Sequence, residues 1–457
     1  MAIATTNPAT GKIEKTFDSL TDSEVDTRIA LAAATAVEYR RTSFAERAGW
    51  MNAAADRLES ACEEIARVMT TEMGKTIVSA RAEVLKCAKG CRFYAEHAES
   101  FLAEEPADAA AVGASRAYVR YEPIGPVLAV MPWNFPLWQV IRFAAPALMA
   151  GNVGLLKHAS NVPQTALLIE DTFRRAGFPD GAFQTLLIGA SSVERILRNP
   201  RVRAATLTGS TPAGRSIGSI AGEVLKPVVL ELGGSDPFVV MPSADVDKAA
   251  QVAVTARVQN NGQSCIAAKR FIVHTDVADA FEERFVARMQ ALRIGDPMDE
   301  SIDIGPLANE QGVLDVESFM QDAVARGARV LCGGERVDRP GWFYPPTVVT
   351  DITSEMRIYH EEIFGPVAQL FRVRDAAEAV ALANATVFGL GSNIWSTDEK
   401  EQSYFVDALD SGAVFVNGMT TSYPELPFGG VKESGFGREL SSQGIRAFCN
   451  VKTVWIG

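Results

Sequence analysis

The chain is poor in cysteine, histidine and aromatic residues for its length of 457 residues. It contains six cysteines and four histidines, and aromatic residues make up 8% of it. Six cysteines in a chain of this size do not form a disulfide framework, and their spacing does not match paired zinc ligands. The composition therefore predicts a reducing, cytoplasmic environment and no bound metal.

Long apolar runs and basic clusters are also missing. No uninterrupted apolar stretch approaches the roughly 20 residues of a membrane-spanning helix, and the opening MAIATTNPATGKIEKTF lacks the basic and apolar segments of a signal peptide. Lys and Arg number 44 against 56 Asp and Glu, a formal charge of −12. Phosphate binding would need a Lys/Arg face, so we expect neither a membrane nor a nucleic-acid partner.

What the chain does contain is typical of compact α/β proteins. Apolar residues make up 47% and charged residues 22%, and the length suits roughly two or three domains. Residues 23–103 read as helical. In residues 126–234, and again in residues 237–427, short aliphatic runs alternate with helical stretches. Such βαβ repeats predict an α/β fold class with doubly wound parallel sheets.

One cysteine has unusual neighbours. Cys265 lies in NNGQSCIAAK, where Gly262 and Ser264 leave room around the sulfur and let backbone N–H groups approach a bound atom. A thiolate is the strongest nucleophile among the side chains. The alternative is a buried structural cysteine, which is the default for a single cysteine.

Two further residues suit catalysis by their position. Glu231 ends the aliphatic run VVLEL just before a Gly-Gly turn, where α/β sheets build their sites, and a buried carboxylate there can act as a general base. Asn134 lies between two prolines and two tryptophans in PWNFPLW, and a rigidly held amide suits an oxyanion hole. A solvated charge beside a turn and a turn asparagine are the alternatives.

A glycine turn suggests phosphate binding. In TLTGSTPAGRSIG an aliphatic run is followed by Gly209, Ser210, Gly214 and a helical stretch. Glycine at a strand-to-helix turn lets a phosphate approach backbone N–H groups. The full dinucleotide fingerprint is absent, so this turn alone is weak evidence. The sequence EMGKT, Glu72–Thr76, mimics a P-loop, but Met69 replaces its first glycine and the preceding residues are helical.

Six motifs together resemble the aldehyde dehydrogenase superfamily. PWNFP, LTGS, LELGG, NNGQSC, EEIFGP and PFGGVKESGFGRE occur in that family's order over essentially the whole chain, most like bacterial succinate-semialdehyde dehydrogenases. The resemblance implies that Cys265 attacks the aldehyde, that Asn134 and the Cys265 N–H hold the oxyanion, and that Glu231 activates the water that hydrolyses the thioester.

The resemblance also implies a nicotinamide cofactor and its contacts. NAD-preferring relatives have Glu three residues after the lysine that matches Lys157, whereas this chain has Ser160. A carboxylate would repel a 2′-phosphate and a hydroxyl can bind it, so we expect NADP, with NAD as the alternative. The implied cofactor-binding residues are Trp133, Lys157, Ser160, Gly209, Ser210, Gly214, Leu232, Glu362 and Phe364.

Substrate contacts are implied by fewer residues. Arg142 stands where succinate-semialdehyde dehydrogenases have an arginine for the distal carboxylate, and an exposed helix charge is its alternative. Gln259 replaces a second arginine found in some of them. Ser422 or Tyr423, before PELPFGG, is a further expected contact. The expected partner is therefore a small aldehyde with a distal carboxylate.

The resemblance divides the chain into three parts. Residues 1–110 and 124–232 are expected to form a Rossmann-like dinucleotide-binding domain, and 233–430 a second Rossmann-like domain that carries the catalytic cysteine. Residues 111–123 and 440–457 are expected to hold two lone β-strands of an oligomerisation segment, each pairing with the sheet of a neighbouring subunit. The resemblance therefore implies a homodimer or a homotetramer.

Other functions remain open at this level. A broader-range or glutarate-semialdehyde dehydrogenase would use the same catalytic residues, and a CoA-acylating dehydrogenase would replace water by a thiol. A thiol esterase or amidase would use Cys265 without the glycine turn. A non-catalytic protein of this fold would tolerate loss of Cys265, Glu231 or Asn134, and all three are present.

Overall fold

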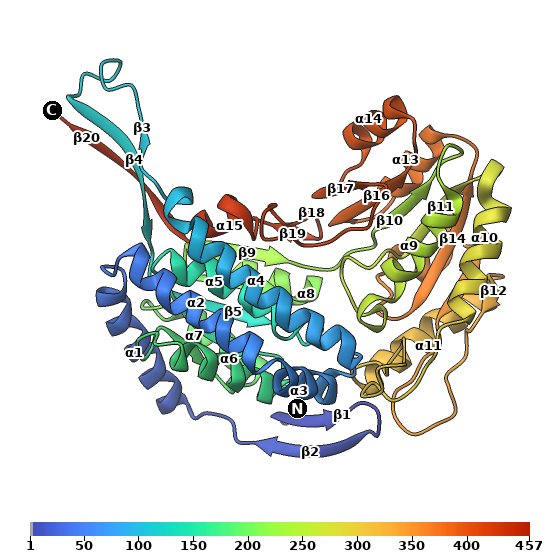
Figure 1. Cartoon of the computed structure of the whole chain (residues 1–457), viewed down its shortest axis with the longest axis horizontal. Helices are drawn as coiled ribbons and strands as arrows, with labels where there is room; N and C mark the ends of the chain where they lie inside the picture. Colours follow the sequence, from blue (N-terminus) through green and yellow to red (C-terminus); the bar gives the residue numbers. More distant parts are fainter. Residues whose placement is uncertain (1–2) are drawn as a thin grey trace.

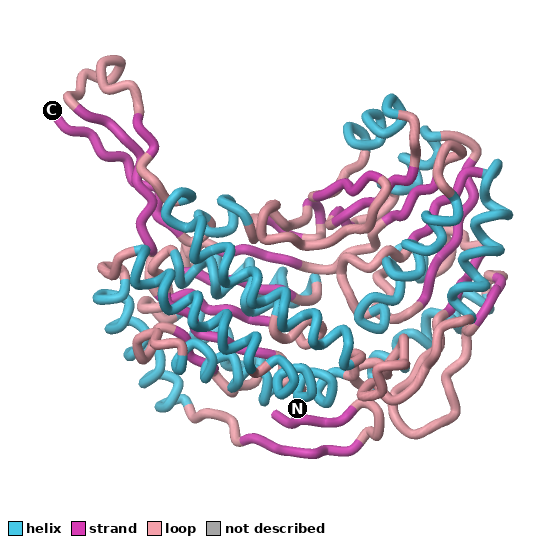
Figure 2. The backbone as a smooth tube through the Cα atoms, viewed as in Figure 1, coloured by secondary structure: helices cyan, strands magenta, loops and turns pink. Residues whose placement is uncertain are grey.

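The computed structural model describes residues 3–457 and has two α/β bodies and a projecting arm (Figure 1). Strands lie inside each body and helices lie outside, as Figure 2 shows. Among the described residues, no helix is long and apolar enough to cross a bilayer, and no group of three His, Cys, Asp or Glu side chains is arranged to hold a metal ion.

The first body is built on a six-stranded sheet. Its strand order is β19-β9-β8-β5-β6-β7, and all neighbours are parallel except β19, which runs antiparallel to β9. Because the chain runs outward from β5 on both sides, the sheet is doubly wound with its switch point beside β5. The strands are β5 (Pro126–Met131), β6 (Val153–His158), β7 (Phe183–Thr185), β8 (Ala204–Thr208), β9 (Val228–Glu231) and β19 (Gly435–Phe436).

Helices cover this sheet, and the predicted helical segment 23–103 is confirmed. Its first two helices begin with capping boxes at Thr21 and Ser43, each paired with a glutamate three residues later. The four helices of the segment are α1 (Asp22–Tyr39), α2 (Phe44–Ser60), α3 (Cys62–Met73) and α4 (Ile77–Phe101). The others are α5 (Trp138–Met149), α6 (Pro163–Arg175), α7 (Val193–Arg198), α8 (Thr211–Glu223) and α15 (Ser441–Arg446).

The second body contains a seven-stranded sheet of order β12-β13-β14-β11-β10-β16-β17. Only β12 is antiparallel to its neighbour, so this sheet is also doubly wound, and the predicted fold class is confirmed. Its strands are β10 (Pro237–Val240), β11 (Arg270–His274), β12 (Arg329–Cys332), β13 (Thr347–Thr350), β14 (Val367–Val373), β16 (Gly391–Trp395) and β17 (Ala413–Val416).

Helices of the second body lie on both sides of its sheet (Figure 2). They are α9 (Val246–Val258), α10 (Thr275–Gln290), α11 (Glu310–Ala325), α12 (Arg357–His360), α13 (Ala376–Asn384) and α14 (Glu399–Ala408). The short strands β15 (Phe388–Gly389) and β18 (Val431–Lys432) pair as the chain returns to the first body.

The arm differs from the prediction of two lone strands. β4 (Arg116–Pro123) and β20 (Cys449–Ile456) pair with each other over their full length, because the returning chain places β20 antiparallel beside β4. A third strand, β3 (Glu105–Pro106), pairs with the other side of β4, although it falls within the segment assigned to the dinucleotide-binding domain. Figure 1 shows the arm leaving the body with the C-terminus near its tip.

An N-terminal hairpin was not anticipated from the sequence. β1 (Ile3–Asn7) and β2 (Lys12–Phe17) pair antiparallel, and the Ala4 N–H donates to the Ser160 carbonyl at 3.0 Å. β2 is exposed along almost its whole length, so its hydrophobic pattern is weak.

Candidate active site

The carboxyl edge of the first sheet gathers several predicted residues. Trp133 follows β5, Gly209 follows β8, and Glu231 is the last residue of β9. The Gly209 N–H donates to the Glu231 carbonyl at 2.9 Å, which ties the glycine turn to the end of β9. Ligands of doubly wound sheets bind in the crevice at the switch point, here between β5 and β8.

The NNG sequence before Cys265 forms a left-handed turn. Asn260, Asn261 and Gly262 have φ of 55°, 57° and 77°, within the 3-10 segment η2 (Gln259–Gly262). Asparagine and glycine tolerate this conformation better than other residues. A Cβ at Gly262 would lie 2.5 Å from the Gly365 carbonyl carbon, so only glycine fits there. The turn directs the chain into the loop that carries Cys265.

Cys265 is a free cysteine that keeps part of its surface exposed. Burial raises the pKa of the Cys265 thiol to about 12, whereas the positive charges of Arg142 and Lys269 lower it. A Cβ at Gly234 would lie 2.6 Å from the Cys265 carbonyl oxygen, so the Gly-Gly turn after β9 allows the two segments to approach closely.

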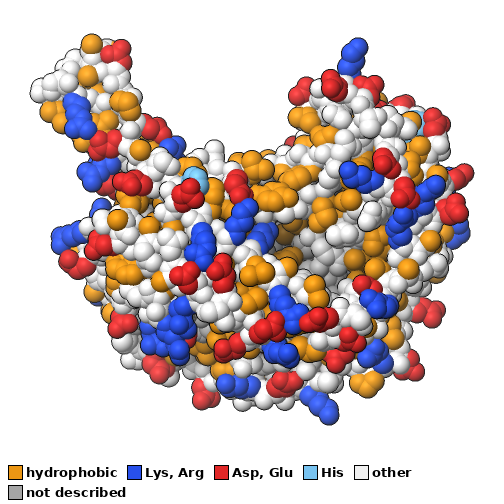
Figure 3. Space-filling view, viewed as in Figure 1, with side chains coloured by type: hydrophobic (Ala, Val, Ile, Leu, Met, Phe, Trp, Pro, Cys, Tyr) orange, Lys and Arg blue, Asp and Glu red, His pale blue; other side chains and the backbone are white. Residues whose placement is uncertain are grey.

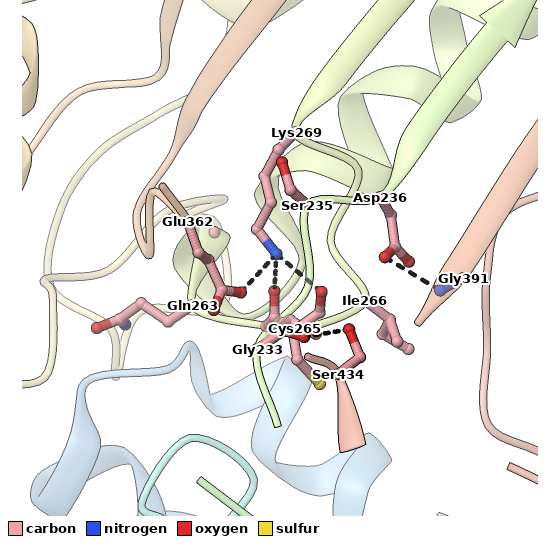
Figure 4. Close-up of polar contacts among 12 residues, drawn as sticks. Gly233, Ser235, Asp236, Gln263, Cys265, Ile266, Lys269, Glu362, Gly391 and Ser434 are labelled. Carbon is pink, nitrogen blue, oxygen red and sulfur yellow. Dashed lines mark hydrogen bonds and ion pairs between the residues drawn. The ribbon is translucent and has the colours of Figure 1, made fainter. Parts of the chain in front are cut away.

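Lys269 holds the loop that carries Cys265 (the cysteine loop) in place, as Figure 4 shows. Its Nζ donates to the carbonyls of Ser264 and Cys265 at 3.0 and 2.8 Å and forms an ion pair with Glu362 at 2.9 Å. Lys269 is fully buried. Glu362, one of the predicted cofactor residues, is therefore held beside the cysteine loop.

Glu231 is buried, which excludes the solvated-charge alternative. Its side chain is 2% exposed, and neither carboxylate oxygen has a hydrogen-bond partner among the described residues. Burial raises the pKa of Glu231 well above its usual value, nearby Glu439 raises it further, and Arg142 and Arg438 oppose the rise. A buried carboxyl group with free oxygens and a raised pKa is suited to proton transfer.

Arg142 is likewise not an exposed helix charge. It is 2% exposed, forms an ion pair with Glu439, and its Nη2 lies 3.4 Å from the Thr208 hydroxyl. Its guanidinium also stacks on the Phe428 ring at 4.6 Å. These contacts fix the side chain, and its charge acts on both Cys265 and Glu231.

Asn134 is held in a buried loop. Its side-chain Nδ2 donates to the Gln263 carbonyl at 3.2 Å, and its own carbonyl accepts a hydrogen bond from Asn260 at 2.6 Å. The loop is fixed further by Glu83, whose Oε1 accepts the N–H groups of Leu137 and Trp138, both at 2.9 Å. These bonds bring the Asn134 amide next to the cysteine loop.

The predicted cofactor residues lie along the same edge. Trp133 and Phe364, from different bodies, meet edge to face with ring centroids 5.7 Å apart. Ser210 is the N-cap residue of α8, whose first N–H groups face the crevice end of the sheet. Lys157 lies near the end of β6 without an acidic partner among residues 3–457, and burial lowers its pKa.

Gly214 and Leu232, two of the predicted cofactor residues, pack against each other. Gly214 is buried in the first turn of α8, and a Cβ there would lie 2.5 Å from the Leu232 side chain. The glycine thus allows α8 to pack closely on the chain after β9.

The two residues predicted to contact the substrate carboxylate, Ser422 and Tyr423, differ in burial. Ser422 is 4% exposed and accepts hydrogen bonds from Lys86 and Trp138, whereas Tyr423 is 42% exposed. Gln259 lines a cavity of about 540 Å³ together with Lys86 and Trp138. The sequence offered no sign of Lys86, Lys269 or Glu439, because each meets the site through a partner far away along the chain.

The space-filling view shows the molecule hollowed between its two bodies (Figure 3). The site's residues come from both bodies, with Glu231 on β9 of the first and Cys265 before β11 of the second, and the Glu231 charge acts on the Cys265 thiol. A model of the aldehyde dehydrogenase family matches residues 1–454. The chain belongs to the aldehyde dehydrogenase family.

Individual family members are similar over their whole length. The chain is 66% identical over 456 residues to a protein of Mycobacterium tuberculosis named succinate-semialdehyde dehydrogenase [NADP(+)] 1, covering 100% of both. It is 36% identical, with a TM-score of 0.97 and 100% coverage of both chains, to succinic semialdehyde dehydrogenase from Streptococcus pyogenes, solved in complex with NADP+. A second solved structure, an aldehyde dehydrogenase from Brucella melitensis, matches at 34% identity and a TM-score of 0.95, with 99% of this chain and 93% of that chain covered.

Proposed function

We propose that this aldehyde dehydrogenase oxidises succinate semialdehyde to succinate with NADP+, through a thioester on Cys265. The observation that carries the reaction type is the convergence of the partly exposed Cys265 thiol, the Asn134 amide and the unpartnered Glu231 carboxyl group beside a dinucleotide crevice. The choice of substrate and cofactor is supported by the full-length relatives at 66% identity.

Cys265 forms the first bond. Its sulfur attacks the aldehyde carbon, and the resulting oxyanion accepts hydrogen bonds from the Asn134 side chain and the Cys265 N–H. A nicotinamide held beside Glu362 and Phe364 would supply the hydride acceptor for this carbon. Loss of the hydride re-forms the carbonyl and leaves a thioester on the Cys265 sulfur. The covalent adduct is needed because an aldehyde has no leaving group of its own.

Glu231 completes the cycle. Its carboxylate removes a proton from a water molecule, the water oxygen attacks the thioester carbon, and the carbon–sulfur bond breaks. The leaving thiolate takes up the proton that Glu231 removed from the water, and the acid product leaves. The raised pKa of Glu231 makes it a stronger base than a solvated carboxylate.

The cofactor residues fit a dinucleotide with a 2′-phosphate. Lys157 supplies a positive charge without an acidic partner among the described residues, and Ser160 lies two residues beyond β6 with a hydroxyl in place of a carboxylate. Gly209, Ser210, Gly214 and Trp133 would hold the pyrophosphate side, and Glu362 and Phe364 the nicotinamide ribose. Leu232 would be a further cofactor contact.

Substrate recognition and assembly belong to the same proposal. Arg142 would supply positive charge near the distal carboxylate, and Ser422 and Tyr423 hydrogen bonds to it. The dinucleotide-binding domain would comprise residues 1–110 and 124–232, the catalytic domain 233–430, and the arm 111–123 and 440–457. The arm would join subunits into a cytoplasmic homodimer or homotetramer.

An aldehyde panel tests the proposed function. Reduced-nicotinamide absorbance is followed with succinate semialdehyde, glutarate semialdehyde and butanal, each with NADP+ and NAD+, and products are analysed with and without coenzyme A. We expect the highest kcat/KM for succinate semialdehyde with NADP+, and free succinate as the product. A coenzyme A thioester product, or a higher kcat/KM with NAD+, would contradict it.

A further inference from the structure

One lysine near the site has no acidic partner. Lys86, in the middle of α4, is mostly enclosed by protein, and among the described residues no carboxylate lies within ion-pair distance of its Nζ. The ammonium lies 4.4 Å above the Trp138 ring. Burial, with the nearby Arg142 charge, lowers the pKa of Lys86 to about 8. A cation in such a place is costly unless an anion joins it.

Ser422 links this lysine to the site. Its Oγ accepts hydrogen bonds from Lys86 Nζ and Trp138 Nε1, both at 2.9 Å. A serine hydroxyl has two acceptor positions and one hydrogen to donate. Both acceptor positions are taken, so the hydroxyl hydrogen is left to donate to an incoming oxygen.

The acidic residues around the same cavity already have partners. Glu83, one turn before Lys86, forms an ion pair with Lys75 and accepts two backbone N–H groups. Glu300 pairs with Arg81 at 2.6 Å, and Asp303 pairs with Arg293 at 3.3 Å. No carboxylate that lines the cavity is therefore free to neutralise Lys86.

The cavity adjoins the cysteine loop. Its lining includes Lys86, Trp138, Gln259 and Asn260, and Asn260 donates to the Asn134 carbonyl. Arg142 lies one helical turn beyond Trp138 and acts electrostatically on both Lys86 and Cys265. Gln259 is neutral, so Lys86 is the cation of the cavity wall that lacks an acidic partner.

We propose that Lys86, together with the Ser422 hydroxyl, binds the distal carboxylate of a semialdehyde whose aldehyde end reaches Cys265. This inference rests on the proposed function and names the cation that selects an acidic substrate. Arg142 is already paired with Glu439, so its charge assists while Lys86 and Ser422 make the contact.

The test compares two four-carbon aldehydes. Succinate semialdehyde carries the carboxylate and butanal does not, and kcat/KM is measured for both with wild type, Lys86→Met, Lys86→Arg, Ser422→Ala and the control Lys89→Met. Lys89 lies on the same helix, is exposed, and pairs with Glu425. The control removes the same unit of charge from the same helix.

The ratio of the two kcat/KM values is the readout. Lys86→Met is expected to lower it roughly 10- to 100-fold, mainly through KM for succinate semialdehyde, which is the loss expected for one charge-assisted hydrogen bond. Ser422→Ala is expected to lower it less, Lys86→Arg to preserve most of it, and Lys89→Met to leave it unchanged.

The experiment distinguishes a failure of the proposed function from a failure of the assignment of Lys86. If wild type prefers butanal, the proposed substrate is wrong. If wild type prefers succinate semialdehyde but neither Lys86→Met nor Ser422→Ala changes the ratio, the assignment of Lys86 is wrong. The butanal activity of each variant reports whether its site is folded.

Discussion

At the scale of single residues, burial controls the reactivity of Cys265. Its raised pKa, about 12, means that the free enzyme holds the thiol protonated near neutral pH. Below the pKa the thiolate fraction grows about tenfold per pH unit. We therefore expect the alkylation rate of Cys265 by iodoacetamide to rise continuously from pH 7 to pH 9, measured by peptide mass spectrometry with Cys265→Ala as the blank. A plateau below pH 8 would show that the thiol ionises more readily.

A second residue sets the preference between cofactors. Ser160→Glu places a carboxylate near the expected 2′-phosphate, so repulsion should lower the NADP+ to NAD+ ratio of kcat/KM by at least about tenfold. Steady-state kinetics with both cofactors provides the ratio. Ser100→Glu, at an exposed position on α4, is the matched control. An unchanged ratio in Ser160→Glu would remove Ser160 from cofactor selection.

At the scale of elements, the buried pair between Lys75 and Glu83 joins α4 to the loop that carries Asn134. Lys75 is fully buried, and the EMGKT sequence that contains it is thus structural. Glu83→Gln leaves the ammonium without its partner, which is expected to cost about 3–5 kcal/mol of unfolding free energy. Urea unfolding measures this cost.

The exposed pair between Arg81 and Glu63 offers a contrast on neighbouring helices. Glu63→Gln should lower the unfolding free energy far less than Glu83→Gln does, because solvent screens the exposed pair. The double variant Lys75→Met/Glu83→Gln should recover part of the stability lost in Glu83→Gln. Equal losses of unfolding free energy in Glu83→Gln and Glu63→Gln would mean that the buried pair stabilises the fold no more than the exposed pair does.

The elements that the sequence predicts well are those with a strong local pattern. The strands of both sheets read as short aliphatic runs because both faces of each sheet are covered. The N-terminal hairpin was missed, since β2 is exposed and lacks such a pattern. The arm strands were found, but their pairing with each other was not, because local pattern carries no information on partners far apart in the chain.

The candidate site also combines residues that the sequence predicts with contacts that it does not predict. Cys265, Glu231 and Asn134 lie in motifs whose local composition and order point to them. Lys86 meets Ser422 across 336 positions, and Arg142 meets Glu439 only after the chain has returned to the first body. Such contacts depend on tertiary structure, so single-sequence reasoning cannot reach them.

At the scale of the whole molecule, the arm presents an open sheet edge to solvent. Val451 and Ile456 of β20 are 61% and 44% exposed. An apolar edge of this kind tends to pair with another chain. Val451→Lys/Ile456→Lys is therefore expected to lower the oligomeric state measured by light scattering after size-exclusion chromatography. Ile13→Lys, on the exposed strand β2, is the control, and equal masses for all variants would contradict a role of β20 in assembly.

The most direct test of the covalent mechanism traps its intermediate. In Glu231→Gln the water lacks its base, so mixing this variant with succinate semialdehyde and NADP+ should leave a succinyl group on the sulfur, detected by peptide mass spectrometry after acid quenching. The prediction is a modified peptide containing Cys265, in proportion to the NADPH formed in the first turnover. NADPH formation without any modification of Cys265 would contradict the thioester and with it the proposed mechanism.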